Sequence, residues 1–397
     1  MDESLYLYFN CLNDPVLLVG CDDLIKDFSL LFPEWKFQVG GSHKSPLISI
    51  QYEDGEYRFS ASWLKEVKSY IDKVDVLCEL IAQFLVAKSF YDGNALYLHA
   101  AAVAINQKLI VFPSQYRAGK SLLTVCLAAN GYQYFCDDVL PLTIEECKGR
   151  SLGVAPRLRL PIPDNIDSNS KDFIESRMEL RGKRYAYLTL NRMNKASKDD
   201  LLEIGAFVLL SRQKGIQAQI EEIPATTIFQ QLIKQNFARE IKGSLILTTL
   251  SQVISQAKCV KISYDKVDDA IKLISEHFAN WPSCLEVDPH KLHASNPLSN
   301  TIDDIDKDCF LQNEGVQKVS IEGESFLSSP DGTAIYHLNQ IGSGIWELLG
   351  EPTTENGLRS ILSAAFPDVD DSIITKDVST ILSSFRLNNL VAIVKEG

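Results

Sequence analysis

The stretch that decides the fold runs from Leu96 to Leu142 and reads LYLHAAAVAINQKLIVFPSQYRAGKSLLTVCLAANGYQYFCDDVLPL. Near its centre, the apolar run 109–112 is typical of a buried strand, and residues 121–129 carry apolar side chains at helical spacing. Between them lies Ala118-Gly119-Lys120-Ser121. A strand, a tight loop containing Gly-Lys-Ser and a helix form the context that a phosphate-binding loop requires. We therefore predict such a loop here.

The predicted loop has a defined chemistry. Unpaired N–H groups at the start of a helix point at an anion, and the helix dipole favours negative charge there. Lys120 is expected to reach the outer phosphates of a nucleotide, and the hydroxyl of Ser121 to ligate Mg²⁺. Ala118, Gly119 and Leu122 complete the predicted phosphate-binding segment around them.

The loop departs from the full pattern G-x-x-x-x-G-K-[ST] at two positions. Ser114 replaces the first Gly, and Arg117 stands where related loops often carry a small residue. Because Gly tolerates positive φ and close backbone approach, these two changes can tighten or distort the loop. Arg117 alternatively adds a cation to the phosphate cradle, so both residues enter the predicted nucleotide site. An ordinary strand–helix turn with a chance Gly-Lys-Ser is the other interpretation.

A pair of carboxylates follows the next predicted strand, 132–136. Asp137 and Asp138 stand at its end, and His99 ends the earlier strand 96–98. Paired carboxylates beside a phosphate loop can divide two tasks, since one orients Mg²⁺ and the other accepts a proton from the attacking hydroxyl. A neighbouring His can orient a carboxylate and tune its basicity. Taken singly, these residues favour a capped turn and a structural His over catalysis. Taken together with Gly-Lys-Ser at this spacing, they favour catalysis.

These motifs together resemble the HPr kinase/phosphorylase superfamily. The residues that carry the resemblance are 99–103 (HAAAV), 112–121 (FPSQYRAGKS) and 136–141 (CDDVLP). The chain is more similar to the shorter HPr-kinase-like proteins found with peptide-modifying enzymes than to the HPr regulator itself. The resemblance implies an ATP- and Mg²⁺-dependent serine kinase.

The resemblance also implies a role for individual residues. Lys120 and Ser121 would act on ATP–Mg²⁺, Asp137 would be the proton acceptor with His99 beside it, and Asp138 would be the Mg²⁺ ligand. In the HPr enzyme an acidic residue follows the loop Ser, whereas this chain has Leu122. No second signature for the phosphorylase reaction is visible, so the resemblance supports only the kinase direction.

Two basic segments follow the carboxylates. Residues 156–161 read PRLRLP, an extended segment in which Arg157 and Arg159 alternate outward. Because an Arg fork suits phosphate, we expect one of them to face ATP or the transferring phosphoryl group, and we assign Arg159 to the nucleotide site. The polar residues 164–171 predict a loop. The basic turn 181–185 then contributes Arg184, which the resemblance places near the nucleotide. A solvated edge strand and a solvated charge run are the alternative interpretations.

Composition limits the class of protein. The 397 residues suffice for two or three domains, and 45% hydrophobic with 23% charged residues is ordinary for a globular protein. A net charge of −13 argues against a nucleic-acid binder. Nine dispersed cysteines without C-x-x-C fit reduced thiols. With neither a signal peptide nor an apolar run of membrane length, we expect a cytoplasmic protein that binds no membrane.

The chain divides into four predicted parts. Residues 1–91 form a mixed α/β segment that packs on the core, with a hairpin turn at Asp54-Gly55 and a helix over 74–90. Residues 92–283 form the α/β kinase domain with the phosphate loop, since strands and helices alternate. Residues 284–311 form an acidic linker, and 312–397 a small domain. In the linker, Cys284, His290 and His293 have a metal-like spacing, but we prefer a solvated segment, because metal sites need a fixed ligand set.

The last segment predicts a winged-helix-like unit. Two strands, 325–327 and 334–338, are joined by a turn at 330–332, and three helices and a closing strand follow. The helices are predicted at 341–349, 358–366 and 373–388, and the strand at 390–394. The runs AIYHLN (334–339) and GIWELL (344–349) resemble the PqqD family.

The PqqD resemblance covers Phe326 to the end, and it implies a peptide-recognition domain of ribosomal peptide modification. Such domains bind the leader of a precursor peptide as an added strand beside the last long helix. From Thr301 onward the chain has 16 acidic and 6 basic residues, a net charge of −10. This acidity suits a basic leader; alternatively, it only keeps the domain soluble.

The whole sequence therefore predicts a kinase fused to its own peptide-recruiting domain. ATP and Mg²⁺ are the expected cofactors, and the acceptor is a hydroxyl, most simply a Ser, of a precursor peptide. Two alternatives stay open at this point: a nucleotide-gated binding protein without transfer activity, and a small-molecule kinase with a C-terminal scaffold domain. HPr kinases form hexamers, so a homo-oligomer is also open.

Overall fold

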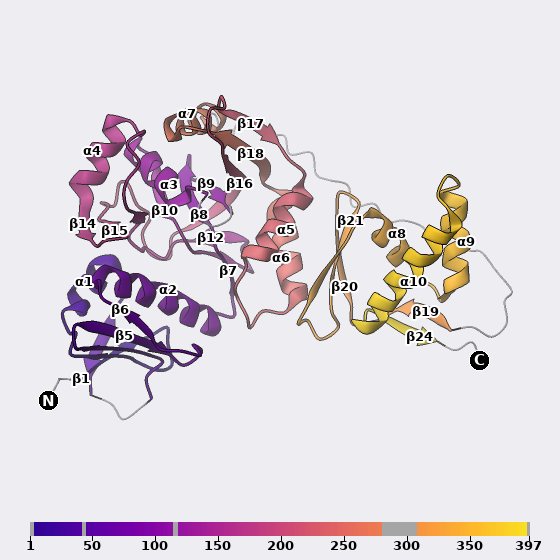
Figure 1. The fold of residues 1–397 in the computed structure, drawn as a ribbon, viewed down its shortest axis with the longest axis horizontal. Coiled ribbons are helices and arrows are strands. Elements are labelled where there is room, and N and C mark those ends of the chain that lie inside the picture. The colour runs from indigo at the N-terminus through magenta and orange to yellow at the C-terminus, as the bar shows by residue number, and fades with distance from the viewer. Residues whose placement is uncertain (1–3, 42–44, 114–117, 280–307, 395–397) are drawn as a thin grey trace. The chain divides into compact units, whose positions relative to one another are not determined.

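The computed structural model describes residues 4–41, 45–113, 118–279 and 308–394 (Figure 1). The chain forms two compact units. Unit 1 comprises Met1–Glu240 and Gln256–Val287, and unit 2 comprises Ile241–Ser255 and Asp288–Gly397. Unit 2 thus includes a short piece of the segment that we predicted as kinase domain, and our four boundaries stay predictions. Ser114, Arg117 and the linker residues Cys284, His290 and His293 lie outside the described residues.

Unit 1 begins with a six-stranded sheet of order β3-β1-β2-β4-β5-β6. Its strands are β1 (Ser4–Phe9), β2 (Val16–Val19), β3 (Phe37–Gly40), β4 (Ile48–Glu53), β5 (Glu56–Ala61) and β6 (Lys68–Tyr70). The hairpin predicted at Asp54-Gly55 is confirmed, and both residues have the positive φ that a two-residue turn of this kind requires, 53° and 83°.

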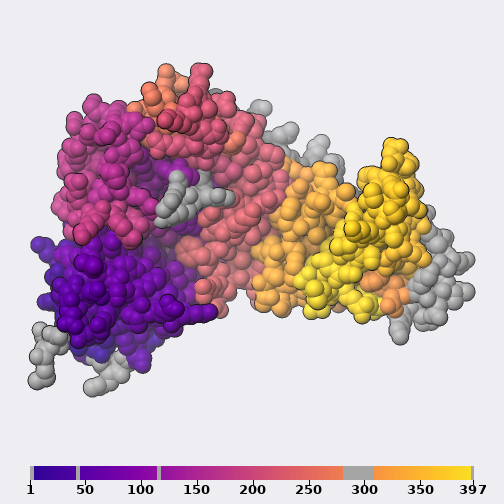
Figure 2. All heavy atoms as spheres, in the orientation of Figure 1, coloured from indigo at the N-terminus to yellow at the C-terminus, as the bar shows by residue number. Residues whose placement is uncertain are grey.

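Helices α1 (Leu24–Leu31) and α2 (Lys73–Tyr91) share a hydrophobic core with this first sheet. The helix predicted at 74–90 is therefore confirmed. It begins where the Asp72 side chain accepts a hydrogen bond of 2.8 Å from the Val74 N–H. Figure 2 shows the indigo N-terminal segment packed against the magenta part of the same unit, and α2 makes this contact.

The centre of unit 1 is a nine-stranded mixed sheet. Its strands are β7 (Ala95–Leu98), β8 (Ala101–Ile105), β9 (Lys108–Phe112), β10 (Gln133–Cys136), β11 (Leu140–Thr143), β12 (Lys148–Arg150), β16 (Leu201–Arg212), β17 (Gln219–Glu222) and β18 (Lys258–Tyr264). The order β10-β8-β9-β16 places the strands around Gly-Lys-Ser side by side, and β16 runs parallel to both β9 and β18. The predicted mixed α/β fold class and the buried strand at 109–112 are confirmed.

Three helices of unit 1 follow strands of this sheet: α3 (Lys120–Ala129), α5 (Ala225–Gln235) and α7 (Val267–Phe278). The apolar faces of α3 and α7 share one hydrophobic core with β8, β9, β16 and β18 (Figure 1). Because β9 and α3 share that core, the packing of the sheet positions the helix that begins at Lys120.

A small sheet of order β13-β15-β14 completes unit 1. It consists of β13 (Arg157–Arg159), β14 (Met178–Arg181) and β15 (Tyr185–Leu188). The loop predicted at 164–171 is wrong in its second half, because helix α4 (Ser168–Arg177) begins there. The Asp167 side chain caps it by accepting from the Ser170 N–H at 2.9 Å, and the buried Ile174 anchors it. A mostly polar helix with one anchor leaves no amphipathic pattern.

Unit 2 contains two three-stranded sheets, of order β23-β19-β24 and β20-β21-β22. Its elements are α6 (Gly243–Ser255), β19 (Cys309–Gln312), β20 (Gln317–Ile321), β21 (Glu324–Ser328), β22 (Ile335–Leu338), α8 (Gln340–Leu348), β23 (Thr353–Thr354), α9 (Glu355–Ala365), α10 (Asp371–Leu387) and β24 (Val391–Val394). The predicted strands at 325–327 and 334–338 and the three helices are confirmed. We did not predict β19 or β20, and β19 begins inside our linker segment.

Two features hold unit 2 together. Trp346 of α8 is buried against Phe385 of α10, with ring centroids 5.6 Å apart. Helix α6 contacts β20 and β21, and the Gly243 N–H at its start donates a 2.8 Å hydrogen bond to the Gly332 carbonyl. A Cβ at Gly243 would lie 2.9 Å from the Ser328 hydroxyl, so this close approach depends on glycine.

Among the described residues, no helix combines the length and the apolar character needed to cross a bilayer. The eight cysteines within the described segments carry free thiols.

Candidate active site

The Gly-Lys-Ser segment starts a helix, as predicted. Helix α3 begins at Lys120, and Gly119 precedes it with a φ of 87°, a conformation that side-chain-bearing residues rarely adopt. A Cβ at Gly119 would lie 3.2 Å from the Tyr264 hydroxyl, which donates to the Ala118 carbonyl at 3.4 Å. Since N–H groups in the first turn of a helix have no intrahelical partner, this turn has the geometry of an anion site.

Lys120 is almost fully buried at the start of α3, with 7% of its surface exposed. Burial lowers the pKa of its ammonium group, and the carboxylates of Asp138 and Asp137 oppose this shift. The lysine thus shares one electrostatic environment with both predicted carboxylates. A buried ammonium group is stabilised by a further anion, and a phosphate group would supply it.

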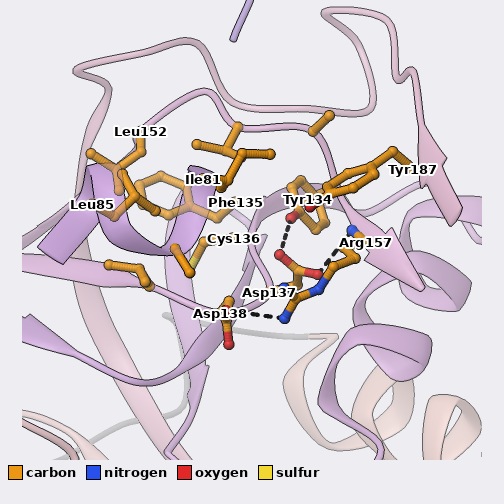
Figure 3. Close-up of a pocket in the computed structure, with 14 residues that line it drawn as sticks. Ile81, Leu85, Tyr134, Phe135, Cys136, Asp137, Asp138, Leu152, Arg157 and Tyr187 are labelled. Carbon is orange, nitrogen blue, oxygen red and sulfur yellow. Dashed lines mark hydrogen bonds and ion pairs between the residues drawn. The ribbon is translucent and has the colours of Figure 1, made fainter. Parts of the chain in front are cut away.

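Asp137 is buried, and hydrogen bonds hold both of its oxygens (Figure 3). The Tyr134 hydroxyl donates to Oδ1 at 2.9 Å, and the Arg157 backbone N–H donates to Oδ2 at 3.0 Å. Burial raises the pKa of the Asp137 carboxyl, while the Arg157 charge acts in the opposite direction. A carboxylate with a raised pKa is a better proton acceptor near neutral pH than an exposed one.

Asp138 is more accessible, with a third of its side chain exposed. Its Oδ1 lies 3.4 Å from His99 Nδ1, and its Oδ2 lies 3.2 Å from Arg157 Nη2. The backbone N–H of His99 donates to the Gln235 carbonyl of α5 at 2.9 Å, which fixes the histidine between β7 and β8. Burial lowers the pKa of His99, and Asp138 partly offsets this effect.

These groups line one cleft that opens to solvent and has a volume of about 420 Å³. The lining comprises His99, Ala118, Gly119, Lys120, Ser121, Leu122, Asp137, Asp138, Arg157, Leu158, Arg159, Leu160, Pro161, Pro163, Tyr185 and Arg212. All predicted site residues within the described segments belong to this set except Arg184. The cleft has four cationic side chains, of lysine and arginine, against two carboxylates, which suits a polyphosphate ligand.

Arg184 lies beside this set. Its Nε is 3.1 Å from Asp75 Oδ2 of α2, and its guanidinium lies 5.4 Å from the centroid of the Tyr185 ring. Tyr185 lines the cleft, so Arg184 contacts a residue of the cleft wall without lining the cleft itself. Its assignment to the nucleotide site stays a prediction.

Arg157 is the arginine of PRLRLP that we did not assign to the nucleotide site, and the structure places it in the cleft. It lies on β13, and its guanidinium contacts Asp138, the Tyr185 ring at 5.2 Å and, through Nη1 at 2.6 Å, the Cys78 thiol of α2. The only local signal was the alternation in PRLRLP, which places Arg157 and Arg159 on the same side of a strand. That pattern does not reveal that Arg157 meets the carboxylates.

A second cavity borders the same two carboxylates (Figure 3). Its wall is mostly apolar and includes Ile81 and Leu85 of α2 together with Phe135 and Leu152. The N-terminal segment therefore forms part of the support behind the acidic pair.

The donor set fits a magnesium ion that a nucleotide brings with it. Within the described segments, no group of three or more His, Cys, Asp or Glu side chains is placed to hold a metal. Mg²⁺ is commonly held by one or two protein oxygens together with substrate phosphates. The Ser121 hydroxyl and the Asp138 carboxylate, which line the same cleft, supply such oxygens.

Unit 2 has an edge strand. Strand β22 lies at the end of the order β20-β21-β22, where an extended peptide can add as a further strand. Tyr336 of this strand donates to the Asn388 side chain, just after α10, at 3.1 Å. His337 lies 2.7 Å from Glu324 Oε2 and stacks on the Phe326 ring.

Comparison with known proteins gives three findings. The family model of coenzyme PQQ synthesis protein D (PqqD) matches residues 324–391. The solved structure of TbiB1 in complex with the TbiA(beta) leader peptide is similar at 21% identity and a TM-score of 0.20, covering 22% of this chain and 99% of that chain. The Hpr(Ser) kinase/phosphatase from Coxiella burnetii is similar at 14% identity and a TM-score of 0.24, covering 46% of this chain and 96% of that chain.

A search of curated proteins finds no match. The matched residues 324–391 run from β21 to the first residue of β24 and so cover the three helices α8, α9 and α10. The C-terminal part of the chain is a PqqD domain, and the structural neighbours of the chain include an HPr kinase/phosphatase.

Proposed function

We propose that this protein is an ATP-dependent serine kinase that phosphorylates a ribosomally made precursor peptide recruited by its PqqD domain. One observation carries the proposal: Lys120 at the start of α3, the Asp137–Asp138 pair and His99 line a single cleft. These are the groups that a phosphoryl transfer requires, namely a phosphate-binding helix start, a metal-ligating carboxylate and a proton acceptor.

In the proposed reaction, the acceptor hydroxyl oxygen bonds to the γ-phosphorus of ATP. The bond between that phosphorus and the β–γ bridging oxygen breaks, and ADP leaves. The hydroxyl proton passes to Asp137, whose raised pKa suits this role, and Tyr134 and the Arg157 N–H hold that carboxylate in place. Lys120 and the N–H groups of the first turn of α3 stabilise charge on the phosphates.

Magnesium, when bound, would supply positive charge that neutralises the phosphates. Ser121 and Asp138 would hold it. His99 orients Asp138 through the 3.4 Å contact at Oδ1. Burial lowers the pKa of His99, so its imidazole stays neutral near neutral pH and does not add a positive charge beside that of the metal. The assignment thus separates the two carboxylates into a buried proton acceptor and an accessible metal ligand.

The PqqD domain supports the choice of a peptide as the substrate. Its edge strand β22 can pair with a leader peptide through main-chain hydrogen bonds. The net charge of −10 from Thr301 onward favours a leader with basic residues. Because recruitment and chemistry are in one chain, the acceptor segment has a raised effective concentration at the cleft. The free thiols fit a cytoplasmic kinase.

The deciding experiment is intact-mass analysis of a precursor peptide encoded beside this protein, after incubation with the full-length chain and ATP–Mg²⁺. We expect a mass increase of one phosphoryl group, located on a Ser by fragmentation. ATP binding without any phosphorylated peptide would favour the nucleotide-gated binding protein. Failure of the chain to retain the peptide at all would favour the small-molecule kinase.

A further inference from the structure

We propose that Arg157 is a further catalytic residue: its guanidinium holds Asp138 until the metal takes that carboxylate, and it then contacts the phosphoryl group in transfer. This inference rests on the proposed function and adds a residue to it. From the sequence, Arg157 is one of two candidate arginines in PRLRLP, and the structure adds its ion pair with Asp138.

The backbone of Arg157 cannot move far. Its N–H donates to Asp137 Oδ2 at 3.0 Å, and Arg157 pairs with Tyr187 of the neighbouring strand β15. The carboxylate that receives this bond is itself fixed by the Tyr134 hydroxyl at 2.9 Å. Any rearrangement at this position is therefore a rotation of the long side chain about a fixed Cα.

The guanidinium forms an ion pair with Asp138, the predicted metal ligand. Its Nη2 lies 3.2 Å from Asp138 Oδ2, while the other oxygen of that carboxylate faces His99. A divalent ion and a guanidinium on the same carboxylate repel each other at short range. Metal binding at Asp138 and the Arg157–Asp138 ion pair therefore compete.

After leaving Asp138, the guanidinium can bind phosphate oxygens in the same cleft. Arg157 lines the cleft together with Lys120 and Ser121, so phosphate oxygens bound at the start of α3 are anions within the same cavity. The Tyr185 ring, 5.2 Å from the guanidinium carbon, provides an aromatic face along which a planar cation can turn. Arginine matches phosphate with two parallel donors, and an arginine supplied in this way raises kcat by about 10³–10⁵ in nucleotide triphosphatases.

A purely structural role is the competing explanation. The contacts of Arg157 with Cys78, at 2.6 Å, and with Asp138 also stabilise the packing of α2 against β13. The two roles differ in their effect on metal binding. A competitor for Asp138 weakens metal affinity, whereas a structural brace supports it.

The test uses Arg157→Met and Arg157→Lys in the full-length chain, with Arg192→Met as the matched control, since Arg192 is an exposed arginine outside the cleft. Mn²⁺ replaces Mg²⁺ as the probe, and electron paramagnetic resonance measures its affinity in the presence of a non-hydrolysable ATP analogue. Steady-state phosphorylation of the peptide gives kcat and KM, and thermal melting checks that each variant is folded.

For Arg157→Met we expect Mn²⁺ to bind several-fold more tightly, because its competitor is gone, while kcat falls about 10²–10³-fold, the loss typical of removing one transition-state donor. Arg157→Lys keeps the charge and loses the fork, so its kcat should lie between those of wild type and Arg157→Met. The control should match wild type in both measurements.

Unchanged or weaker Mn²⁺ binding in Arg157→Met would overturn the inference, and so would an unchanged kcat. Should Arg157→Met fail to fold, Arg157→Lys decides alone, since a wild-type kcat there would rule out a role for the fork. If wild type itself transfers no phosphoryl group, the proposed function fails. In that case the Mn²⁺ titration still shows whether Arg157 and the metal compete for Asp138.

Discussion

The cleft at the start of α3 and the edge of β22 differ in the segments of the chain that form them. The cleft brings together His99, Lys120, Asp138 and Arg157 from separate parts of the chain, and these side chains are buried or half-buried. The edge of β22 belongs to one continuous segment, and an edge strand has unpaired backbone N–H and C=O groups. Charge in a desolvated pocket gives chemistry, whereas an open strand edge gives affinity for an extended peptide.

This difference makes the two regions separable by mutation. Removing a charge from the cleft leaves its partners buried and unpaired, so the effect on the reaction is large. Removing one backbone hydrogen bond at a strand edge costs a single exposed interaction, so the effect on binding is moderate. The predictions below test whether each loss stays in its own region.

The largest effect is expected for Lys120→Met. The variant lacks the cation that α3 presents to the phosphates, so phosphorylation should fall by at least about 10²–10³-fold. Binding of a fluorescently labelled leader peptide, measured by polarisation, should stay at the wild-type level. The exposed Lys266→Met is the matched control and should change neither quantity.

If Lys120→Met weakened leader binding as much as it weakened turnover, the two regions would not be independent, and the proposed division of labour would be wrong.

An intermediate effect is expected for proline in β22. Consecutive N–H groups of a strand point in opposite directions. Of the variants Tyr336→Pro and His337→Pro, one therefore removes an N–H that faces the open edge (outward), and the other removes an N–H that faces β21. The variant without the outward group should bind the leader about 3–10-fold more weakly, since a hydrogen bond contributes roughly 0.5–1.5 kcal/mol. Its kcat at saturating peptide should be unchanged.

Polarisation and steady-state kinetics on the same two variants separate KM from kcat. The prediction is wrong if neither proline affects leader binding while both variants remain folded, because the leader would then bind elsewhere on the PqqD domain.

The smallest effect is expected in how the free energy of unfolding depends on pH, compared between wild type and Asp137→Asn. Burial raises the pKa of the Asp137 carboxyl, so the native state binds more protons than the unfolded state between the two pKa values. The wild-type free energy of unfolding should therefore decline, relative to that of Asp137→Asn, as pH rises from about 4 through the raised pKa. Above that pKa the difference should be constant. Urea unfolding midpoints from about pH 4 to 7 measure it.

A difference that grew with pH would show that the Tyr134 and Arg157 hydrogen bonds outweigh burial at this carboxyl, and that its pKa in the folded protein is depressed.

Several elements were predictable from sequence because their signals are local. The buried strand before Gly119 and the helix from Lys120 follow from an apolar run and a period of 3.6 residues. The helix α8 after Asn339 follows from its cap, whose side chain accepts from the Gly342 N–H at 2.9 Å. Each signal lies within about one or two turns of the residue concerned.

Other elements gave no such signal. Helix α4 was missed because it is polar and depends on one buried Ile174, and β19 pairs with β24, whose residues lie at the far end of the domain. The contacts of Arg157 were not predicted, because its partners Asp138 and Cys78 belong to other elements. Contacts between distant segments leave no period or spacing in the chain to read.

By itself, the sequence determined the helix start at Lys120, the acidic pair after β10 and the PqqD domain, because caps, apolar periods and contiguous motifs act over short distances. Only the tertiary structure decided that Asp137 is held on both oxygens, that Arg157 occupies Asp138, and that α6 joins the unit of the PqqD domain. The physical reason is the same in each case: burial and ion pairing depend on which segments the fold brings together, and strand pairing and packing fix that choice.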